Sequence, residues 1–361
     1  MSWALGAQGR SALKASAGRY ADTLFLERVG FMDIPGVRPV RFFTYDAEGN
    51  RTLVRESPPA TARGIDPDIR HSHVDQVVLG YEREIAAGAV FQAGYVARRF
   101  GDFMAITETQ LDWTPVTLVD PGVDGREGTG DDGGSFTAYR QANPGTLFLW
   151  LTNPAGAARR YDGLQAMVRR RFARGWQGQA SYTWSRTTGT MTNSEFVTAG
   201  LNDAGHLTGT LYAGKFLNPN GAINNRGRAQ YDIREFKAHG GYALERLGGL
   251  VMSGILQHRS GNRWQRQVTY FDKLIPGDFQ TVLLEPRGSR STAGWWNLDL
   301  RLEKALYRRA GGPAASVAFD VFYATNQGTA LVVFPGVGPS FGMPLTRTDP
   351  RQLRLLVRTA F

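Results

Sequence analysis

The last residues of the chain constrain its fold most strongly. From Gln352 to Phe361, every second residue from Leu353 onward belongs to one mostly apolar set, and that set ends in the aromatic Phe361. The residues between them include Arg354 and Arg358. Side chains on a strand point alternately to its two faces, so this pattern predicts one apolar and one polar face. A strand of about ten residues is long enough to cross a bilayer, which predicts a strand of an outer-membrane barrel.

A second stretch shows the same alternation more completely and also supplies a length. Trp176, Tyr182 and Trp184 lie on one side of the segment 176–185, whose other side carries only Gln, Ser and Thr. Two residues at the positions of Trp176 and Trp184 lie ~26 Å apart at ~3.3 Å per residue. A strand tilt of ~40° reduces this to ~20 Å along the membrane normal, which is near the ~25 Å between the aromatic girdles of a membrane barrel.

Short turns alternate with long loops along the chain. We expect strands at 9–19, 73–85, 89–104, 161–172, 176–185, 233–244, 249–260, 295–303, 316–323 and 351–361. Short turns are expected at 86–88, 173–175, 245–248 and 308–313, and long loops at 105–159, 187–230, 261–293 and 326–350. The long segment that ends near residue 70 is expected to carry a small hairpin at 47–50. This asymmetry predicts an all-β, antiparallel transmembrane β-barrel with about ten spanning strands, short periplasmic turns and long extracellular loops.

The composition agrees with a turn-rich all-β chain. Gly occurs 44 times and aromatic residues make up 11% of the sequence. No apolar run approaches the roughly 18 residues of a transmembrane helix. This excludes helical membrane proteins but not barrels, whose strands carry their signal in alternation. The absence of cysteine excludes both a disulfide scaffold and a thiolate metal site.

The charge pattern argues against nucleic acid as a partner. The formal net charge is +10, and most of the basic residues are arginines scattered over strands, turns and loops. A nucleic-acid-binding protein gathers such residues in one patch with aromatic residues between them. The sequence also lacks a nucleophile elbow, a P-loop and an HExxH motif, so we expect no enzyme.

Several segments together resemble a known family. They are Gly-Tyr-Glu-Arg-Glu at 80–84, Ala-Ser-Tyr-Thr-Trp-Ser at 180–185, Leu-Asp-Leu-Arg-Leu-Glu-Lys at 298–304, Asp-Val-Phe-Tyr-Ala-Thr-Asn at 320–326, and the ending 350–361. In this order they resemble the C-terminal barrel segments of TonB-dependent outer-membrane receptors. The resemblance is to the Oar-like group, whose plug follows a carboxypeptidase-regulatory-like domain, and it covers roughly residues 12–361.

The resemblance implies a barrel of roughly 22 strands around a plug, with energy from the TonB complex and a place in the outer membrane. Residues 1–361 correspond to the C-terminal portion of that barrel. The first residues lack the basic region and apolar stretch of a signal peptide, and no plug or TonB-box-like segment is recognisable. We therefore expect a receptor or transporter part that contacts outer-membrane lipid and takes up a bulky solute. It would contact the TonB complex only through a plug outside these residues.

The resemblance also gives the last residue a role. In such proteins a terminal aromatic residue is recognised by the barrel-assembly machinery, so Phe361 is the expected membrane-insertion signal. It would mark the periplasmic end of its strand. The short turns would then lie in the periplasm and the long loops outside the cell.

Aromatic residues in the long loops are the candidate ligand contacts. They are Trp113, Phe136, Tyr139, Phe196, Tyr212, Trp264 and Tyr270. Their alternative role is to pack the loops against one another. The sequence does not indicate whether the solute is a siderophore, a peptide, a glycan or a protein.

The loop 120–133 is the candidate metal site. Asp120, Asp124, Asp131 and Asp132 are closely spaced among glycines, and such carboxylates suit a hard cation such as calcium. The segment lacks the full EF-hand pattern of alternating ligands closed by a glutamate. The alternative is an acidic, flexible external loop.

Two other functions remain open. A small barrel of about ten strands acting as a passive pore or an adhesin would close by pairing residues 12–18 with 353–361. A soluble β-rich binding or hydrolytic domain would have a filled core and would dissolve without detergent.

Overall fold

The computed structural model describes most of the chain. The described residues are 1–6, 9–21, 40–46, 48–57, 62–108, 111–143, 148–190, 219–229, 232–277, 279–308 and 314–360. Phe196, Tyr212 and Phe361, which the sequence singled out, lie outside these ranges.

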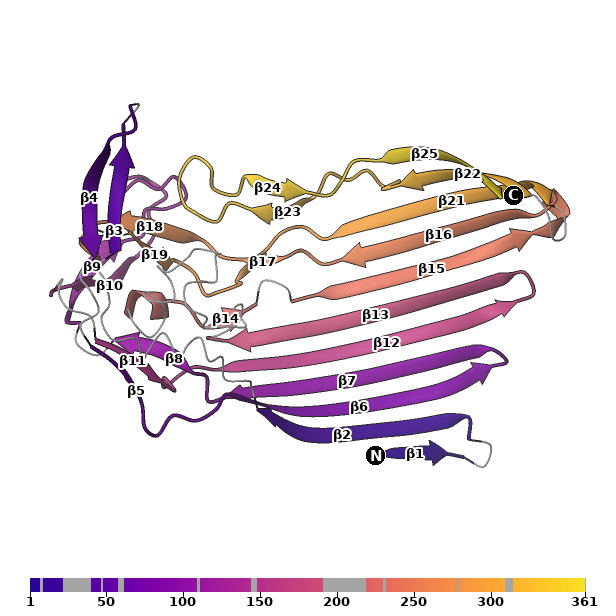
Figure 1. Ribbon diagram of the computed structural model, residues 1–361, viewed down its shortest axis with the longest axis horizontal. Helices are drawn as coiled ribbons and strands as arrows, with labels where there is room; N and C mark the ends of the chain where they lie inside the picture. Colours follow the sequence, from indigo (N-terminus) through magenta and orange to yellow (C-terminus); the bar gives the residue numbers. More distant parts are fainter. Residues whose placement is uncertain are drawn as a thin grey trace.

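One antiparallel sheet dominates the described part of the chain (Figure 1). It has twelve strands in the order β1-β2-β6-β7-β12-β13-β15-β16-β21-β22-β25, with the short β14 beside β13. Its strands are β1 (Ser2–Leu5), β2 (Ser11–Ala21), β6 (His73–Ala86), β7 (Ala89–Gly101), β12 (Arg159–Ala173), β13 (Trp176–Gly189), β14 (Gly227–Arg228), β15 (Arg234–Leu244), β16 (Leu250–Arg259), β21 (Trp295–Arg308), β22 (Ala314–Phe322) and β25 (Gln352–Ala360). Each of the long strands expected from alternation is present, so this prediction is confirmed.

The short connections lie together at one end of the sheet (Figure 1). Arg174 and Gly175 turn the chain between β12 and β13 with φ of 54° and 83°. The 3-10 helix η2 (Glu245–Leu247) and Gly248, with φ of 66°, join β15 to β16. Positive φ favours glycine, which explains why glycine recurs in these connections. The turns predicted at 86–88, 173–175 and 245–248 are confirmed, whereas most of 308–313 lies outside the described residues.

One face of the sheet is apolar and exposed. The register places Leu79, Tyr95, Leu164 and Trp184 in one row across β6, β7, β12 and β13. Leu79 and Leu164 are 49% and 44% exposed. Large apolar side chains exposed along many neighbouring strands are stabilised by contact with lipid. This face is the lipid-contacting face.

The opposite face carries charged side chains that pair across strands. Asp320 on β22 is 2% exposed, and it pairs with Arg354 at 2.7 Å and with Arg301 at 3.5 Å. Lys14 pairs with Glu82 at 2.8 Å. A polar inner wall is typical of an outer-membrane barrel, so this face lines the lumen.

The sheet is open. Among the described residues β25 pairs only with β22, and β1 pairs only with β2, so these two strands form opposite edges. The pairing of residues 12–18 with 353–361 that a small closed barrel requires is not found in the described part of the chain. β2 pairs with β6 instead.

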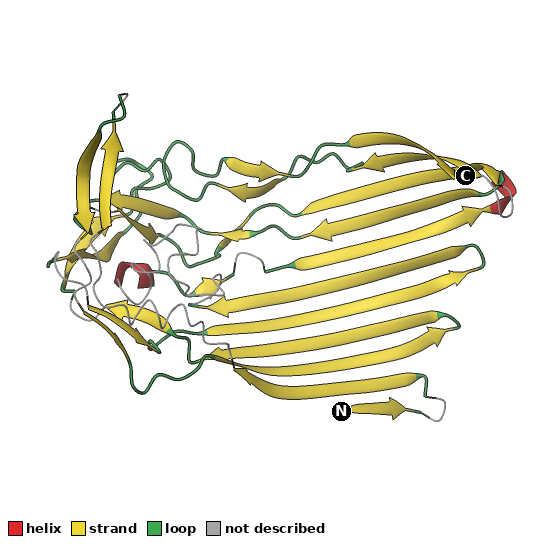
Figure 2. Ribbon diagram, viewed as in Figure 1, coloured by secondary structure: helices red, strands yellow, loops and turns green. Residues whose placement is uncertain are grey.

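The long loops form small sheets at the end opposite the short turns (Figure 2). These elements are β3 (Val40–Tyr45), β4 (Arg51–Ser57), β5 (Ala62–Ile65), β8 (Ala105–Glu108), β9 (Trp113–Val119), β10 (Ser135–Gln141), β11 (Phe148–Thr152), β17 (Arg263–Trp264), β18 (Gln267–Phe271), β19 (Phe279–Leu283), β20 (Arg290–Ser291), β23 (Ala330–Val333), β24 (Pro344–Arg347) and the 3-10 helix η1 (Pro219–Ala222). β3 and β4 form the hairpin predicted at 47–50, which is confirmed. No described helix is long and apolar enough to cross a membrane.

Candidate functional site

The loops β9–β10 and β18–β19 share a hydrophobic core of their own. Leu118, Ala138, Leu274 and Val282 are almost fully buried there. The partly buried side chains packed around this cluster are Val116, Phe136, Ile223, Ile275, Leu284 and Val337. They come from all four long loops, so burial of apolar surface holds these loops together. We call the assembly of residues 113–141, 219–223, 263–277, 279–291 and 334–343 the loop cap.

Backbone and amide contacts connect the loops of the cap. Asn220 of η1 is 1% exposed, its Nδ2 donates to the carbonyl of Tyr139 at 2.7 Å, and its Oδ1 accepts the N–H of Tyr139 at 2.7 Å. The N–H of Val337 donates to the carbonyl of Gln267, and the N–H of Gly338 donates to the carbonyl of Val123, both at 2.9 Å. Segments far apart in the sequence are therefore held in one arrangement.

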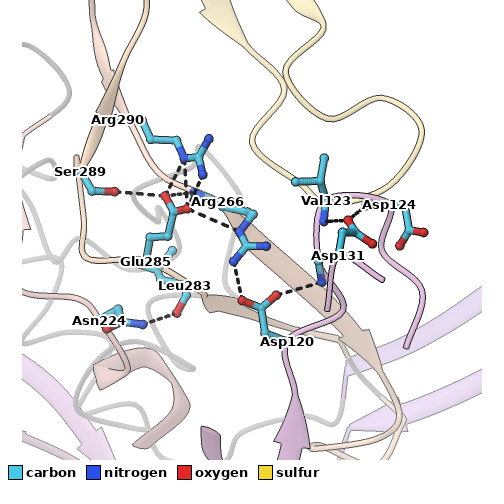
Figure 3. Close-up of polar contacts among 11 residues, drawn as sticks. Asp120, Val123, Asp124, Asp131, Asn224, Arg266, Leu283, Glu285, Ser289 and Arg290 are labelled. Carbon is cyan, nitrogen blue, oxygen red and sulfur yellow. Dashed lines mark hydrogen bonds and ion pairs between the residues drawn. The ribbon is translucent and has the colours of Figure 1, made fainter. Parts of the chain in front are cut away.

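A network of charged groups joins the same loops (Figure 3). The Arg266 guanidinium donates to the Asp120 carboxylate, and the two side chains are only 13% and 12% exposed. Nε of Arg266 also lies 3.5 Å from Oε1 of Glu285. Arg290 donates two hydrogen bonds to the Glu285 carboxylate, from Nη2 to Oε1 at 2.6 Å and from Nε to Oε2 at 2.7 Å. Opposite charges of loops 105–159 and 261–293 thus compensate one another where little water reaches them.

The pKa values of two groups in the cap, Glu285 and Tyr270, are shifted by hydrogen bonds, burial and nearby charges. Hydrogen bonds from Arg290 hold the pKa of Glu285 below its ordinary value, although burial opposes this shift. Burial raises the pKa of Tyr270 to about 12, and the nearby carboxylates of Glu127 and Asp120 act in the same direction. Glu285 is therefore ionised and Tyr270 protonated throughout the physiological range.

The acidic loop 120–133 is ordered by its own carboxylates. Oδ2 of Asp131 accepts the N–H groups of Val123 at 2.6 Å and Asp124 at 3.2 Å, while Oδ1 accepts the hydroxyl of Thr129 at 2.7 Å. Oδ2 of Asp132 accepts the N–H of Gly128 at 2.6 Å. The hydrogen bonds to Asp131 lower the pKa of its carboxyl group, and the bond from Thr129 has the largest effect.

The donor set fits calcium poorly. Among the described residues, no group of three or more His, Asp or Glu side chains converges as a metal-binding set would. Asp120 is engaged by Arg266, and Asp131 and Asp132 accept N–H groups of the loop itself. Asp124 accepts the N–H of Arg126 at 2.8 Å. Calcium binding at these four aspartates stays a prediction, and calorimetric titration of the chain with calcium chloride tests it.

Two of the predicted ligand-contact aromatics take part in packing the loops. The rings of Trp264 and Phe341 are 5.5 Å apart, and the Arg290 guanidinium lies 5.5 Å and 5.6 Å from their centres. Tyr270 is 9% exposed and belongs to the core of the cap. Nε1 of Trp264 and the hydroxyl of Tyr270 are buried with no hydrogen-bond partner among the described residues.

The remaining predicted aromatics differ in their placement. Trp113 and Tyr139 are half-buried on β9 and β10, and Phe136 packs against the core of the cap. Because β9 and β10 pair in register, Trp113 lies opposite Gln141 and Phe136 opposite Leu118. Phe196 and Tyr212 lie outside the described residues.

The charged network was not predicted from the sequence. Arg266 and Glu285 stand in different parts of loop 261–293, and Asp120 stands in another loop. No spacing rule relates residues so far apart. The sequence indicates only that Asp120 begins an acidic, glycine-rich loop, and this loop is the predicted metal site.

Comparison with known proteins places this geometry in context. A family model described as an outer membrane beta barrel domain matches residues 23–270. The TonB-dependent transporter Oar of Myxococcus xanthus is 30% identical over 145 residues, which are 39% of this chain and 11% of Oar. The crystal structure of the outer-membrane transporter YddB from Escherichia coli matches with a TM-score of 0.55 at 12% identity, over 99% of this chain and 39% of YddB. The ferripyoverdine receptor of Pseudomonas aeruginosa matches with a TM-score of 0.45 at 12% identity, over 99% of this chain and 31% of the receptor.

The family match covers more than half of the chain and agrees with the exposed apolar face of the sheet. The likeness to YddB supports the fold. The soluble-domain alternative is therefore wrong. The chain spans well under half the length of Oar and of YddB. The chain belongs to the outer-membrane β-barrel domain family and lies in the outer membrane, and over 145 residues it is similar to the TonB-dependent transporter Oar.

Proposed function

We propose that the chain forms the C-terminal part of the barrel of a TonB-dependent receptor, which binds a bulky solute at the loop cap and takes it up through its lumen. The observation that carries this proposal is the open sheet. Within the described residues, β1 and β25 leave unpaired edges. Unpaired N–H and C=O groups along an edge favour pairing with further strands, and a barrel of roughly 22 strands supplies them.

The loop cap supports the binding part of the proposal. Binding residues are often placed on loops that a rigid scaffold positions. Here the scaffold is the sheet, and the cap has its own buried core and charged network. The half-buried rings of Trp113 and Tyr139 offer aromatic surface to a large solute.

Energy coupling can be tested in cells. Cells carrying the intact gene are compared with cells in which the segment encoding residues 1–361 is deleted, for accumulation of fluorescent peptides, fluorescent glycans and ferric siderophores. We expect at least one probe to accumulate only with the segment present, and a protonophore or loss of TonB to stop this. Accumulation that neither treatment affects would contradict TonB dependence.

A passive pore is the second candidate, and liposomes distinguish it from the first. A closed small barrel would give steady swelling of liposomes in arabinose, a small sugar, and less swelling in stachyose, a larger one. The open sheet predicts no such size-limited flux from this chain alone. A reproducible size cut-off would favour the pore.

Recognition of Phe361 by the barrel-assembly machinery is part of the same proposal. Replacing Phe361 with Ala removes the terminal ring and keeps the length of the chain. We expect less protein in the outer membrane and more proteolysis in the periplasm, measured by membrane fractionation. Equal outer-membrane levels of Phe361→Ala and wild type would contradict this role.

A further inference from the structure

An apolar groove crosses the lipid-contacting face of the sheet near the short turns. Its volume is about 860 Å³. The floor consists of Gly178, Gly240 and Gly254, which the register places side by side on β13, β15 and β16. Since glycine has no side chain, three glycines in one row leave a depression where other rows of this face carry large residues.

Large apolar side chains form one side and one end of the groove. Trp176, Tyr242 and Met252 stand in the next row toward the turns, and they are 40%, 49% and 47% exposed. Leu300, which pairs with Gly254, closes the row on β21, and Phe319 lies beside it. The groove therefore matches the shape and chemistry of a hydrocarbon chain.

The other end of the groove is charged. Arg170 on β12 pairs with Gly178, so it continues the glycine row on the same face. Its guanidinium lies 4.1 Å from the centre of the Trp176 ring. Nη2 makes only a long hydrogen bond of 3.5 Å to the carbonyl of Ala173, and Nε is buried with no partner among the described residues. The stacked guanidinium thus keeps donors for an anion.

The stagger of the strands orients the groove in the membrane. Arg170 lies three residues before the end of β12, near the turn to β13, whereas Leu300 lies in the middle of β21. Short turns mark the periplasmic side of an outer-membrane barrel. The charged end therefore lies near the periplasmic surface of the membrane, and the apolar end lies deeper in the hydrocarbon.

We propose that this groove binds a phospholipid of the periplasmic leaflet, with its phosphate at Arg170 and one acyl chain along the glycine row toward Leu300. Four strand spacings of about 4.8 Å separate β12 from β21, so the groove is roughly 19 Å long. One leaflet of the hydrocarbon core is about 15 Å thick, so an acyl chain lying obliquely has a comparable length. An arginine on a lipid-facing surface is also less costly near the interface than at the bilayer centre.

Native mass spectrometry tests the proposal. The chain, purified from outer membranes in detergent, is titrated with dioleoyl phosphatidylglycerol and, separately, with dioleoylglycerol, which lacks the phosphate. We expect one retained phosphatidylglycerol, bound at least about tenfold more tightly than dioleoylglycerol because charge-assisted hydrogen bonds hold the phosphate. Equal retention of the two lipids would overturn the role of Arg170.

Matched variants separate the two parts of the site. Arg170→Gln should remove the preference for phosphatidylglycerol, and Arg169→Gln, which changes the neighbouring residue on the lumen face, should keep it. Gly178→Leu should prevent retention of both lipids by filling the groove. A Cβ at Gly178 has no heavy atom closer than 3.4 Å, so the backbone there accommodates a side chain that projects into the groove. Ala15→Leu introduces the same side chain on the lipid-contacting face away from the groove and should retain lipid.

Three outcomes contradict the proposal. They are unchanged retention in Gly178→Leu, equal retention by Arg170→Gln and Arg169→Gln, and equal loss in Gly178→Leu and Ala15→Leu. The last outcome would show that lipid is lost through general disturbance of the surface.

Discussion

Replacement of Arg266 by Met is expected to open the loop cap while leaving the spanning strands intact. Arg266 and its partner Asp120 are 13% and 12% exposed, so water reaches neither charge well. Removing one member of a buried ion pair costs about 3–5 kcal/mol because the other charge stays buried without compensation. Glu285 keeps Arg290 as a partner, so the lower end, about 3 kcal/mol, applies. This raises the equilibrium for opening by roughly 100-fold.

Hydrogen–deuterium exchange measures this opening strand by strand. The amides of β18 should exchange roughly 100-fold faster in Arg266→Met, and those of β15 and β16 should not change. Lys273→Met is the matched control because Lys273 and Glu127 join the same two loops at 3.1 Å but are 39% and 49% exposed. Such an exposed pair contributes about 0–1 kcal/mol. If the two variants exchanged alike, burial of the Arg266 network would not be what holds the cap.

Three further predictions concern titration, a buried hydroxyl and the lumen wall. Hydrogen bonds from Arg290 lower the pKa of Glu285 in the folded cap. The contribution of Glu285 to cap stability is therefore complete above its unfolded pKa of about 4.3 and is lost as the pH falls through the lower folded pKa. Exchange of the β18 amides should rise only below about pH 4, and a rise near pH 6 caused by this group would contradict the prediction. Tyr270→Phe removes a buried hydroxyl without a hydrogen-bond partner, so β18 should exchange at the same rate or more slowly, and a large acceleration would contradict it. Asp320→Ala removes the carboxylate that Arg301 and Arg354 share. Arg354 is 53% exposed and Arg301 keeps Glu303 at 3.0 Å, so urea unfolding in detergent should show a loss of about 1 kcal/mol, and a loss above about 3 kcal/mol would contradict it.

The spanning strands could be predicted because their signal is local. Alternation between Trp176 and Ser185 follows from the geometry of a single strand, and the register of β13 with its neighbours keeps Trp176, Tyr182 and Trp184 on one face. A strand between lipid and a polar lumen must alternate, whatever its neighbours are. The ends of strands were less certain, since Tyr323 was expected within a strand but has φ of 50° directly after β22.

The loop cap could not be predicted because its contacts are not local. Asn220 bonds to Tyr139, and Arg266 bonds to Asp120, across 81 and 146 positions of the sequence. Composition shows only that these loops contain aromatic and charged residues. The carboxylates of 120–133 predict a metal site, but their spacing does not show that Asp120 is paired with a distant arginine and that Asp131 accepts nearby N–H groups.

The row of glycines on β13, β15 and β16 could also not be predicted from the sequence. The chain has 44 glycines, so nothing in the sequence distinguishes Gly178, Gly240 and Gly254 from the others. Their alignment depends on the register between β13, β15 and β16. A shift of one residue in either pairing would have sent a glycine to the other face.

Cysteine labelling in intact cells tests the central claim most directly, which is that the loop cap faces the outside and the short turns face the periplasm. The sequence has no cysteine, so Val123→Cys in the cap and Arg246→Cys in the turn between β15 and β16 each place a single thiol at an exposed position. A membrane-impermeant maleimide should label Val123→Cys in intact cells and Arg246→Cys only after the outer membrane is permeabilised. Labelling of Arg246→Cys but not Val123→Cys in intact cells would contradict this orientation of the barrel.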